Sequence, residues 1–174
     1  MDQTITPVST KGIIISLLLI VFALASHFSG IDPQSPVQYI GHAIFIGGII
    51  WSIMSYGKQV NHNATFGNYF THGFKVSALI TAIMIIFMVV FIYLFPEIKE
   101  NALAETRKAM LEQNLSEEQT AQTVEMTRNL FGVFAVGGTL LIYLIIGCIV
   151  SLIGAAITKK DPRPVTGDIN QSIQ

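Results

Sequence analysis

Side chains that could carry out chemistry are scarce in the apolar parts of this 174-residue chain. Its four histidines are His27, His42, His62 and His72. They share no spacing typical of metal ligands, and no nucleophile stands at a recognisable spacing from a base. Cys148 is the only cysteine, so it can form no intramolecular disulfide, and its apolar neighbours indicate a buried, inert thiol. We therefore expect no catalytic, cofactor-binding or metal-binding residues.

Three ionisable residues in apolar runs require an explanation, because such residues are costly in lipid. His27 lies near the outer end of the first run, where water can reach it. His42 could titrate or bind a metal, but a hydrogen bond to a neighbouring group is the interpretation we favour. Lys75 is the one charged residue expected within the runs, close enough to an end for its side chain to reach the headgroups. Asp and Glu are absent from the runs, which argues against a carrier that uses an intramembrane carboxylate.

The composition indicates an integral membrane protein. Hydrophobic residues make up 51% of the chain and charged residues 12%, whereas soluble domains carry about 25% charged residues. The formal net charge of −1 offers no basic surface for nucleic acid.

Four apolar runs are each long enough to cross a bilayer as a helix. They occupy residues 12–29, 37–56, 74–95 and 130–157. None alternates in the manner of a β-barrel strand, so the predicted fold is an all-α membrane domain over residues 1–174. A signal-peptidase site at residues 23–25 is the alternative for the first run. We expect a retained helix, because the apolar run continues past that site.

The distribution of Lys and Arg predicts that both termini face the cytoplasm. Lys11 is assigned to the N-terminal tail, Lys58 to the middle loop, and three basic residues to the C-terminal tail, residues 158–174. Those three are Lys159, Lys160 and Arg163. The first loop has no basic residue, and the third pairs four basic residues with seven glutamates.

The third loop, residues 96–129, is predicted to form a helical hairpin outside the membrane. Its first half is rich in good helix formers, and Pro96 suits a first helical turn. Ser116 and Gln119 have the spacing of a capping box that opens a second helix running into the fourth span. The apolar residues of the hairpin are Ile98, Leu103, Met110 and Leu111. They could pack the hairpin against itself, or offer a surface on which a partner docks.

The middle loop carries aromatic residues at helical spacing. Phe66, Phe70 and Phe74 recur every four residues and therefore share one helix face beside Lys75. A short interfacial helix is expected to begin near Asn63 or Thr65. It could anchor the bundle at the inner interface. It could instead contact a lipid or a lipid-linked substrate, with Lys58, His72 and Lys75 as cations.

Small residues in the fourth span suggest close helix packing. Gly147, Ser151 and Ala155 follow one another at intervals of four residues. Such a ridge lets helices approach closely. Packing within one bundle, a homodimer and a contact with another protein are all compatible with it.

Residues 65–162 contain sequence motifs that resemble those of a known family. The most specific is the phrase TFGNYFTHGFKVSALITAI, which begins at Thr65; the second, SLIGAAITKK, runs from Ser151. This chain resembles the four-span inner-membrane proteins of Bacteroidota grouped as domain-of-unknown-function family 4199. The resemblance implies an inner-membrane protein and supplies no activity. It also implies a membrane glycosyltransferase as a candidate partner.

The function we expect is a non-catalytic scaffold or accessory subunit of an inner-membrane complex. Its expected partners are the lipid bilayer and either a membrane protein or a second copy of itself. A homodimeric transporter or channel is the first alternative. An enzyme or accessory protein acting on a lipid-linked substrate, through His62, His72 and Lys75, is the second.

Overall fold

The computed structural model describes residues 5–32 and 35–158, and within them it contains helices and no strand. The order is α1 (Val8–Phe28), the short 3-10 helix η1 (Pro36–Gln38), α2 (Tyr39–Gln59), α3 (Phe66–Leu94), α4 (Glu97–Glu112) and α5 (Glu117–Ile157). The basic residues expected in the C-terminal tail lie outside the described residues.

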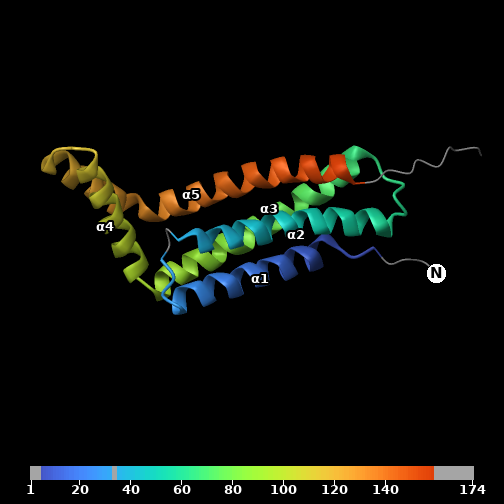
Figure 1. Ribbon diagram of the computed structural model, residues 1–174, viewed down its shortest axis with the longest axis horizontal. Coiled ribbons are helices and arrows are strands. Elements are labelled where there is room, and N and C mark those ends of the chain that lie inside the picture. Colours follow the sequence, from blue (N-terminus) through green and yellow to red (C-terminus); the bar gives the residue numbers. More distant parts are fainter. Residues whose placement is uncertain (1–4, 33–34, 159–174) are drawn as a thin grey trace, which may run out of the picture.

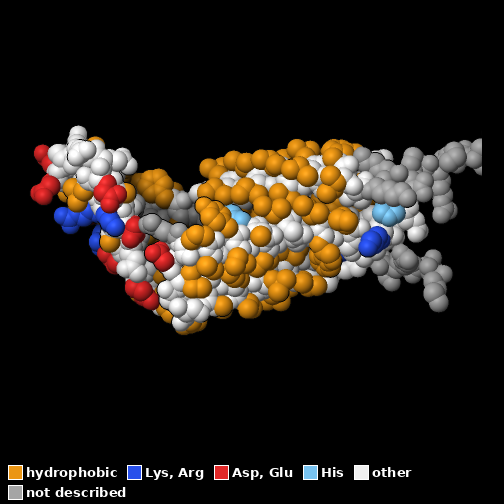
Figure 2. All heavy atoms as spheres, in the orientation of Figure 1, with side chains coloured by type: hydrophobic (Ala, Val, Ile, Leu, Met, Phe, Trp, Pro, Cys, Tyr) orange, Lys and Arg blue, Asp and Glu red, His pale blue; other side chains and the backbone are white. Residues whose placement is uncertain are grey.

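Four of these helices, α1, α2, α3 and α5, are long and apolar enough to cross a membrane. They run side by side as one bundle, with α4 projecting from one end (Figure 1). Apolar side chains cover much of the bundle's outer surface (Figure 2), as lipid contact requires. The prediction of an all-α membrane protein with four spanning helices is confirmed.

The two ends of the bundle differ. We call the end that holds the first residues of α1 and the last residues of α5 the termini end, and the opposite end the hairpin end (Figure 1). In the view of Figure 2, the acidic side chains gather at the hairpin end.

Three helix boundaries differ from the prediction. α2 ends at Gln59 rather than at residue 56, so Lys58 belongs to its last turn and not to the middle loop. α1 begins at Val8 rather than at residue 12, so Lys11 belongs to the helix and not to a tail.

α3 begins at Phe66, where the Thr65 hydroxyl accepts a hydrogen bond from the Asn68 amide at 3.3 Å. The expected interfacial helix is therefore the first part of α3. A separate helix would have needed a break before residue 74, but the helix runs without a break through Gly67 and Gly73, and Gly73 is used there for close contact with Ile53.

The centre of the bundle is a close meeting of α2, α3 and α5. Ile53 of α2 is fully buried between two glycines. A Cβ atom added to Gly73 of α3 would lie 2.5 Å from Ile53 Cδ1, and one added to Gly154 of α5 would lie 2.6 Å from it. A Cβ atom at either position would force the end of the Ile53 side chain to move, so the two glycines allow the three helices to approach closely.

The hairpin at residues 96–129 forms as predicted. Ser116 accepts a hydrogen bond from the Gln119 amide, and the Gln119 side chain accepts one from the Ser116 amide, each at 3.3 Å. This capping box starts α5, which continues without a break from the hairpin into the bundle. Leu103 of α4 is only 3% exposed, and Arg128 of α5 donates two hydrogen bonds to the Glu100 carboxylate. These contacts hold α4 against α5 in the half of the hairpin nearer the bundle.

Candidate functional site

The most unusual site is a polar cluster at the termini end, where α1, α2 and α3 meet. Lys11 of α1 is 1% exposed, and its ammonium donates a hydrogen bond to the Ser52 carbonyl of α2 at 3.2 Å. The Ser52 hydroxyl lies 3.1 Å from Nε2 of His72 on α3. One serine of α2 therefore joins a cation of α1 to an imidazole of α3.

Two tyrosines extend this cluster. The Tyr56 ring stacks on His72 with 4.4 Å between ring centroids and an interplanar angle of 6°. Tyr69 meets Tyr56 edge-on, with 5.9 Å between their centroids. The Tyr69 hydroxyl is buried and donates to no acceptor among the described residues. We call Lys11, Ser52, Tyr56, Tyr69 and His72 the termini-end cluster.

The expectation that Lys75 is the only charge among the spans is wrong, because α1 contains Lys11 and the last turn of α2 contains Lys58. Since α1 begins earlier than expected, Lys11 stands one turn before Ile15 and two turns before Leu19, and both of these are buried. The helix geometry therefore turns Lys11 toward the interior of the bundle.

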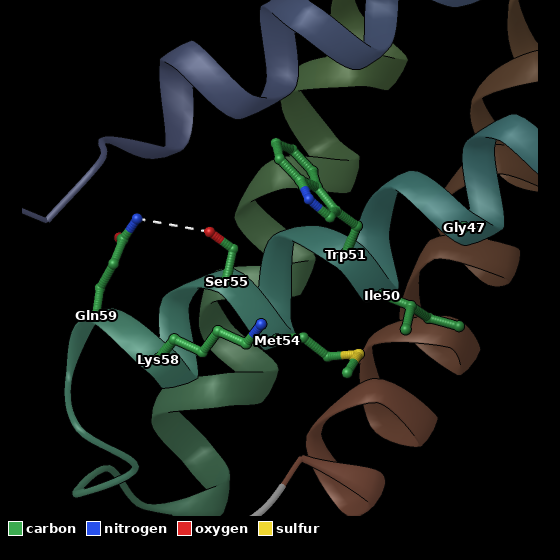
Figure 3. A pocket seen from close by; sticks show the side chains of 7 residues that line it. All are labelled: Gly47, Ile50, Trp51, Met54, Ser55, Lys58 and Gln59. Atoms are coloured by element: carbon green, nitrogen blue, oxygen red, sulfur yellow. Dashed lines mark hydrogen bonds between the residues drawn. The ribbon is translucent and has the colours of Figure 1, made fainter.

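The segment before α1 reaches the end of α2 and is hydrogen-bonded to its last residue. The Thr6 amide donates to the Gln59 side chain at 3.0 Å, and the Gln59 amide group donates back to the Thr6 hydroxyl at 2.8 Å. Gln59 also donates to Ser55 at 3.5 Å (Figure 3). These reciprocal bonds hold the chain just before α1 against the termini end.

Gln59 and Ser55 also border a surface depression of about 490 Å³ on α2 (Figure 3). Its other lining residues are Gly47, Ile50, Trp51, Met54 and Lys58. Trp51 and Lys58 are exposed. A tryptophan and a lysine beside apolar side chains suit the boundary between hydrocarbon and headgroups.

The predicted inner-interface residues do not all reach the surface. Phe66, Phe74 and Lys75 are exposed, whereas Phe70 is half-buried and packs against the core. Phe70 and Phe74 stack with 5.9 Å between centroids. His72 is 7% exposed and bonded to Ser52, so its position does not support the alternative in which it supplies a cation at the surface. It faces α2 because it stands one turn before Val76 and two before Ile80, on the buried face of α3.

The predicted packing ridge faces the interior of the bundle. Gly147, Ser151 and Ala155 are all buried. A Cβ atom on Gly147 would lie 2.5 Å from Ser77 Oγ and 2.7 Å from Ser77 Cβ. The ridge thus brings α5 against α3 within a single chain.

The four apolar hairpin residues separate into two groups. Leu103 is buried, and Ile98 and Met110 are half-buried. Leu111 is 44% exposed and borders a second depression. The residues that line it with Leu111 are Ala104, Arg107, Lys108 and Glu112.

The remaining histidines lie apart from the termini-end cluster or at its edge. The His27 ring contacts Phe91 and Phe95 at the hairpin end, with centroids 5.0 Å and 4.6 Å away. His42 is exposed, and its Nδ1 lies 3.3 Å from the Gln38 carbonyl oxygen, which agrees with the favoured hydrogen bond. His62 is half-buried in the turn before α3, with a left-handed φ of 59°. Among the described residues, no group of three or more His, Cys, Asp and Glu is placed to hold a metal ion.

The sequence model of one family, described as a protein of unknown function (DUF4199), matches residues 10–160. The chain belongs to the DUF4199 family. No curated protein and no solved structure matches it. The family match includes every member of the termini-end cluster, so the cluster lies within the DUF4199 domain.

The termini-end cluster of this DUF4199 chain could not be assembled from the sequence. Ser52, Tyr56 and Tyr69 look like ordinary polar residues near the ends of apolar runs. One signal was present: Lys11, Ile15 and Leu19 share a helix face if the helix begins before residue 12. The partners on α2 and α3 are set by packing, which spacing within one helix does not reveal.

Proposed function

We propose that this chain is a non-catalytic accessory subunit of a complex in the bacterial inner membrane, and that its hairpin docks a partner protein. In this proposal both termini face the cytoplasm and the hairpin stands outside. The exposed Lys58 and Lys75 near the termini end support that orientation, since basic residues concentrate on the cytoplasmic side.

The observation that carries the proposal is the second depression, on the outer face of α4. Exposed Leu111 lies there beside Ala104. Arg107 and Lys108 carry positive charge at this surface, and Glu112 carries negative charge. An apolar side chain surrounded by charged ones is the pattern of a small docking surface, in which burial supplies affinity and charge supplies orientation.

The hairpin is also held firmly enough to present this face. Leu103 is buried, the Glu100 carboxylate takes both hydrogen bonds of Arg128, and the Lys99 ammonium lies 5.9 Å from the centre of the Phe131 ring. A surface fixed before binding loses less conformational entropy when a partner docks.

Photo-crosslinking from the hairpin in living cells tests the docking role. A benzophenone amino acid at Leu111 should give one discrete crosslinked product with another protein, identified by mass spectrometry. The matched control is the same probe at Phe66, an exposed residue at the termini end. The docking role is wrong if Leu111 and Phe66 give the same products, or if Leu111 gives none.

Cysteine labelling tests the orientation. Cys148→Ser removes the only native thiol, and Leu111→Cys or Lys58→Cys then adds one at either end of the molecule. An impermeant maleimide added outside intact inner-membrane spheroplasts should label position 111 and leave position 58 unlabelled. The reverse result would invert the proposed topology.

A further inference from the structure

We propose that the depression on α2 binds one anionic phospholipid, with an acyl chain along its apolar part and the phosphate group at Lys58. This lipid site is separate from the hairpin and from the docking role proposed for it. The starting observation is a cavity of about 490 Å³ whose lining changes from apolar to polar along the helix (Figure 3). The apolar side chains are those of Ile50, Trp51 and Met54, and the polar ones are those of Ser55, Lys58 and Gln59.

The lining residues form two neighbouring rows on the outer face of α2. Residues four apart in a helix lie in one ridge, and adjacent ridges leave a groove between them. Gly47 lies at the apolar end of the groove, where an added Cβ atom would have no atom of the described residues within 4 Å. One row is Trp51, Ser55 and Gln59, and the other is Ile50, Met54 and Lys58.

The length of the groove fits one leaflet of a bilayer. From Gly47 to Lys58 the helix rises about 16 Å. Half of a typical hydrocarbon core is about 15 Å thick. Lys58 lies in the last turn of α2, at the level of the headgroups, so Gly47 lies close to the middle of the membrane. An acyl chain whose headgroup is at Lys58 therefore extends along the whole groove.

The charge at the polar end favours an anionic lipid. The Lys58 side chain is exposed, and an ammonium forms strong, charge-assisted hydrogen bonds with phosphate oxygens. A lysine near the membrane surface also attracts lipids of net negative charge. A zwitterionic phospholipid carries its own cation, which the Lys58 ammonium repels. Trp51 is half exposed and offers the flat face of its ring to the chain below the headgroup.

The side chains along the groove favour a lipid over a helix of another protein. Helices in membranes meet where small residues let their backbones approach. In this bundle Gly73, Gly147 and Gly154 lie at such contacts. The groove is instead bordered mostly by large side chains, Met54 and Trp51 among them. A narrow, flexible acyl chain fits between such side chains without a close approach of backbones.

The test uses Trp51, which is the only tryptophan of the chain and lies in the depression. The full chain is reconstituted in vesicles that contain phosphatidylcholine and phosphatidylglycerol, with bromine on the acyl chains of one lipid or the other. Bromine quenches tryptophan fluorescence on contact, so the two titrations give the relative affinity of the two lipids at Trp51. We expect phosphatidylglycerol to bind about fivefold more tightly, the attraction of one lysine at the surface.

Two lysine variants locate the charge that selects the lipid. Lys58→Met keeps most of the volume of the side chain and removes its charge, so the two lipids should then bind with affinities within about twofold of each other. Lys75→Met is the matched control. Lys75 is an exposed lysine of α3 that does not line the depression, and its replacement should leave the preference of the native chain unchanged.

Two glycine variants separate a lipid bound in the groove from general attraction to the surface. Gly47→Leu fills the apolar end of the groove from a position with open space, so the fold should persist while the preference for phosphatidylglycerol is lost. Gly132→Leu also extends into open space, on α5 away from the depression, and should keep the preference. Equal melting temperatures of the two variants show that neither substitution disturbs the bundle.

The proposal is overturned if the two lipids quench the native chain equally, or if Lys58→Met retains the preference. It is also overturned if Lys75→Met loses as much preference as Lys58→Met, or if Gly47→Leu keeps the preference of the native chain. In those two cases the charge of the surface attracts the lipid and the groove does not hold it. If neither brominated lipid quenches Trp51, a protein covers this face of α2 and the proposal is wrong.

Discussion

Charged side chains have opposite surroundings at the two ends of the molecule. At the hairpin end, Glu100 and Arg128 form an ion pair with both side chains about half exposed. At the termini end, Lys11 is enclosed and bonded to a neutral carbonyl. Water stabilises each charge of the exposed pair on its own, so that pair adds little. The enclosed lysine has no such support, and its surroundings must supply what water does not.

The same contrast runs along α5. Near the termini end, Gly147 and Gly154 have side chains of α3 and α2 within the distance that a Cβ atom would need. Near the hairpin end, Gly132, Gly137 and Gly138 have open space at that position. The glycines in the last turns of α5 thus lie in close contact with neighbouring helices, whereas the glycines nearer the hairpin end do not. The termini end should therefore be sensitive to small changes that the hairpin half tolerates.

Among the substitutions that test this difference between the two ends, the largest effect is expected inside the hairpin. Leu103→Ala removes the only buried leucine of α4 and should weaken the hairpin locally by about 2–5 kcal/mol. Hydrogen exchange should show faster exchange for amides at 97–129 and unchanged protection in the bundle. Leu111→Ala is the matched control, because its side chain is 44% exposed. Equal effects of the two variants, or loss of protection at the termini end, would show that the two regions are not separate.

A pair of glycine variants tests the two halves of α5. Gly147→Ala should lower stability by about 1–3 kcal/mol, because Ser77 Cβ lies 2.7 Å from the new atom and cannot move without the backbone of α3. Gly137→Ala should be neutral or stabilising by up to about 1 kcal/mol, since alanine favours the helix and meets open space. Thermal unfolding in detergent measures both. Similar melting temperatures for the two variants would contradict the difference in packing.

A smaller effect is expected from a substitution of Ser52, the residue that links Lys11 to His72 in the termini-end cluster. Ser52→Ala removes the hydroxyl that meets His72 Nε2 while leaving the carbonyl that accepts from Lys11. We expect a loss of about 1 kcal/mol, the usual contribution of one buried hydrogen bond. Ser55→Ala, one turn away and half-buried, loses only a 3.5 Å contact with Gln59 and should change stability less. An equal loss of stability in Ser55→Ala would mean that the Ser52–His72 hydrogen bond stabilises the protein no more than the contact between Ser55 and Gln59.

What could be predicted from the sequence depended on local signals. The four spans follow from run length, and the start of α5 follows from the Ser116–Gln119 capping box, because a helix cap involves residues only three apart. The hairpin was predictable for the same reason. A helix beginning near Thr65 was predictable as well, and Thr65 caps it. Its continuation without a break into the third span was not, since the sequence before Phe74 is compatible with either one helix or two.

The interior of the bundle could not be predicted, for a physical reason. A membrane helix is apolar on its lipid face as well as on its packed face, so periodicity does not show which side is buried. Lys11 illustrates the consequence. It was assigned to a tail by its position in the chain, whereas its surroundings depend on residues 41 and 61 positions away, Ser52 and His72. Such pairings arise only when the helices assemble.

The smallest expected effect concerns the exposed ion pair of the hairpin. Replacing Arg128 with Met and Glu100 with Gln, singly and together, isolates the coupling between the two side chains. We expect a coupling free energy below about 1 kcal/mol, because both partners are about half exposed. It should fall further between low and high salt, since screening acts on exposed charges. Hydrogen exchange of α4 in the four variants measures it. A coupling of several kcal/mol that does not depend on salt would mean that the pair is shielded from water, and the contrast with Lys11 would then no longer hold.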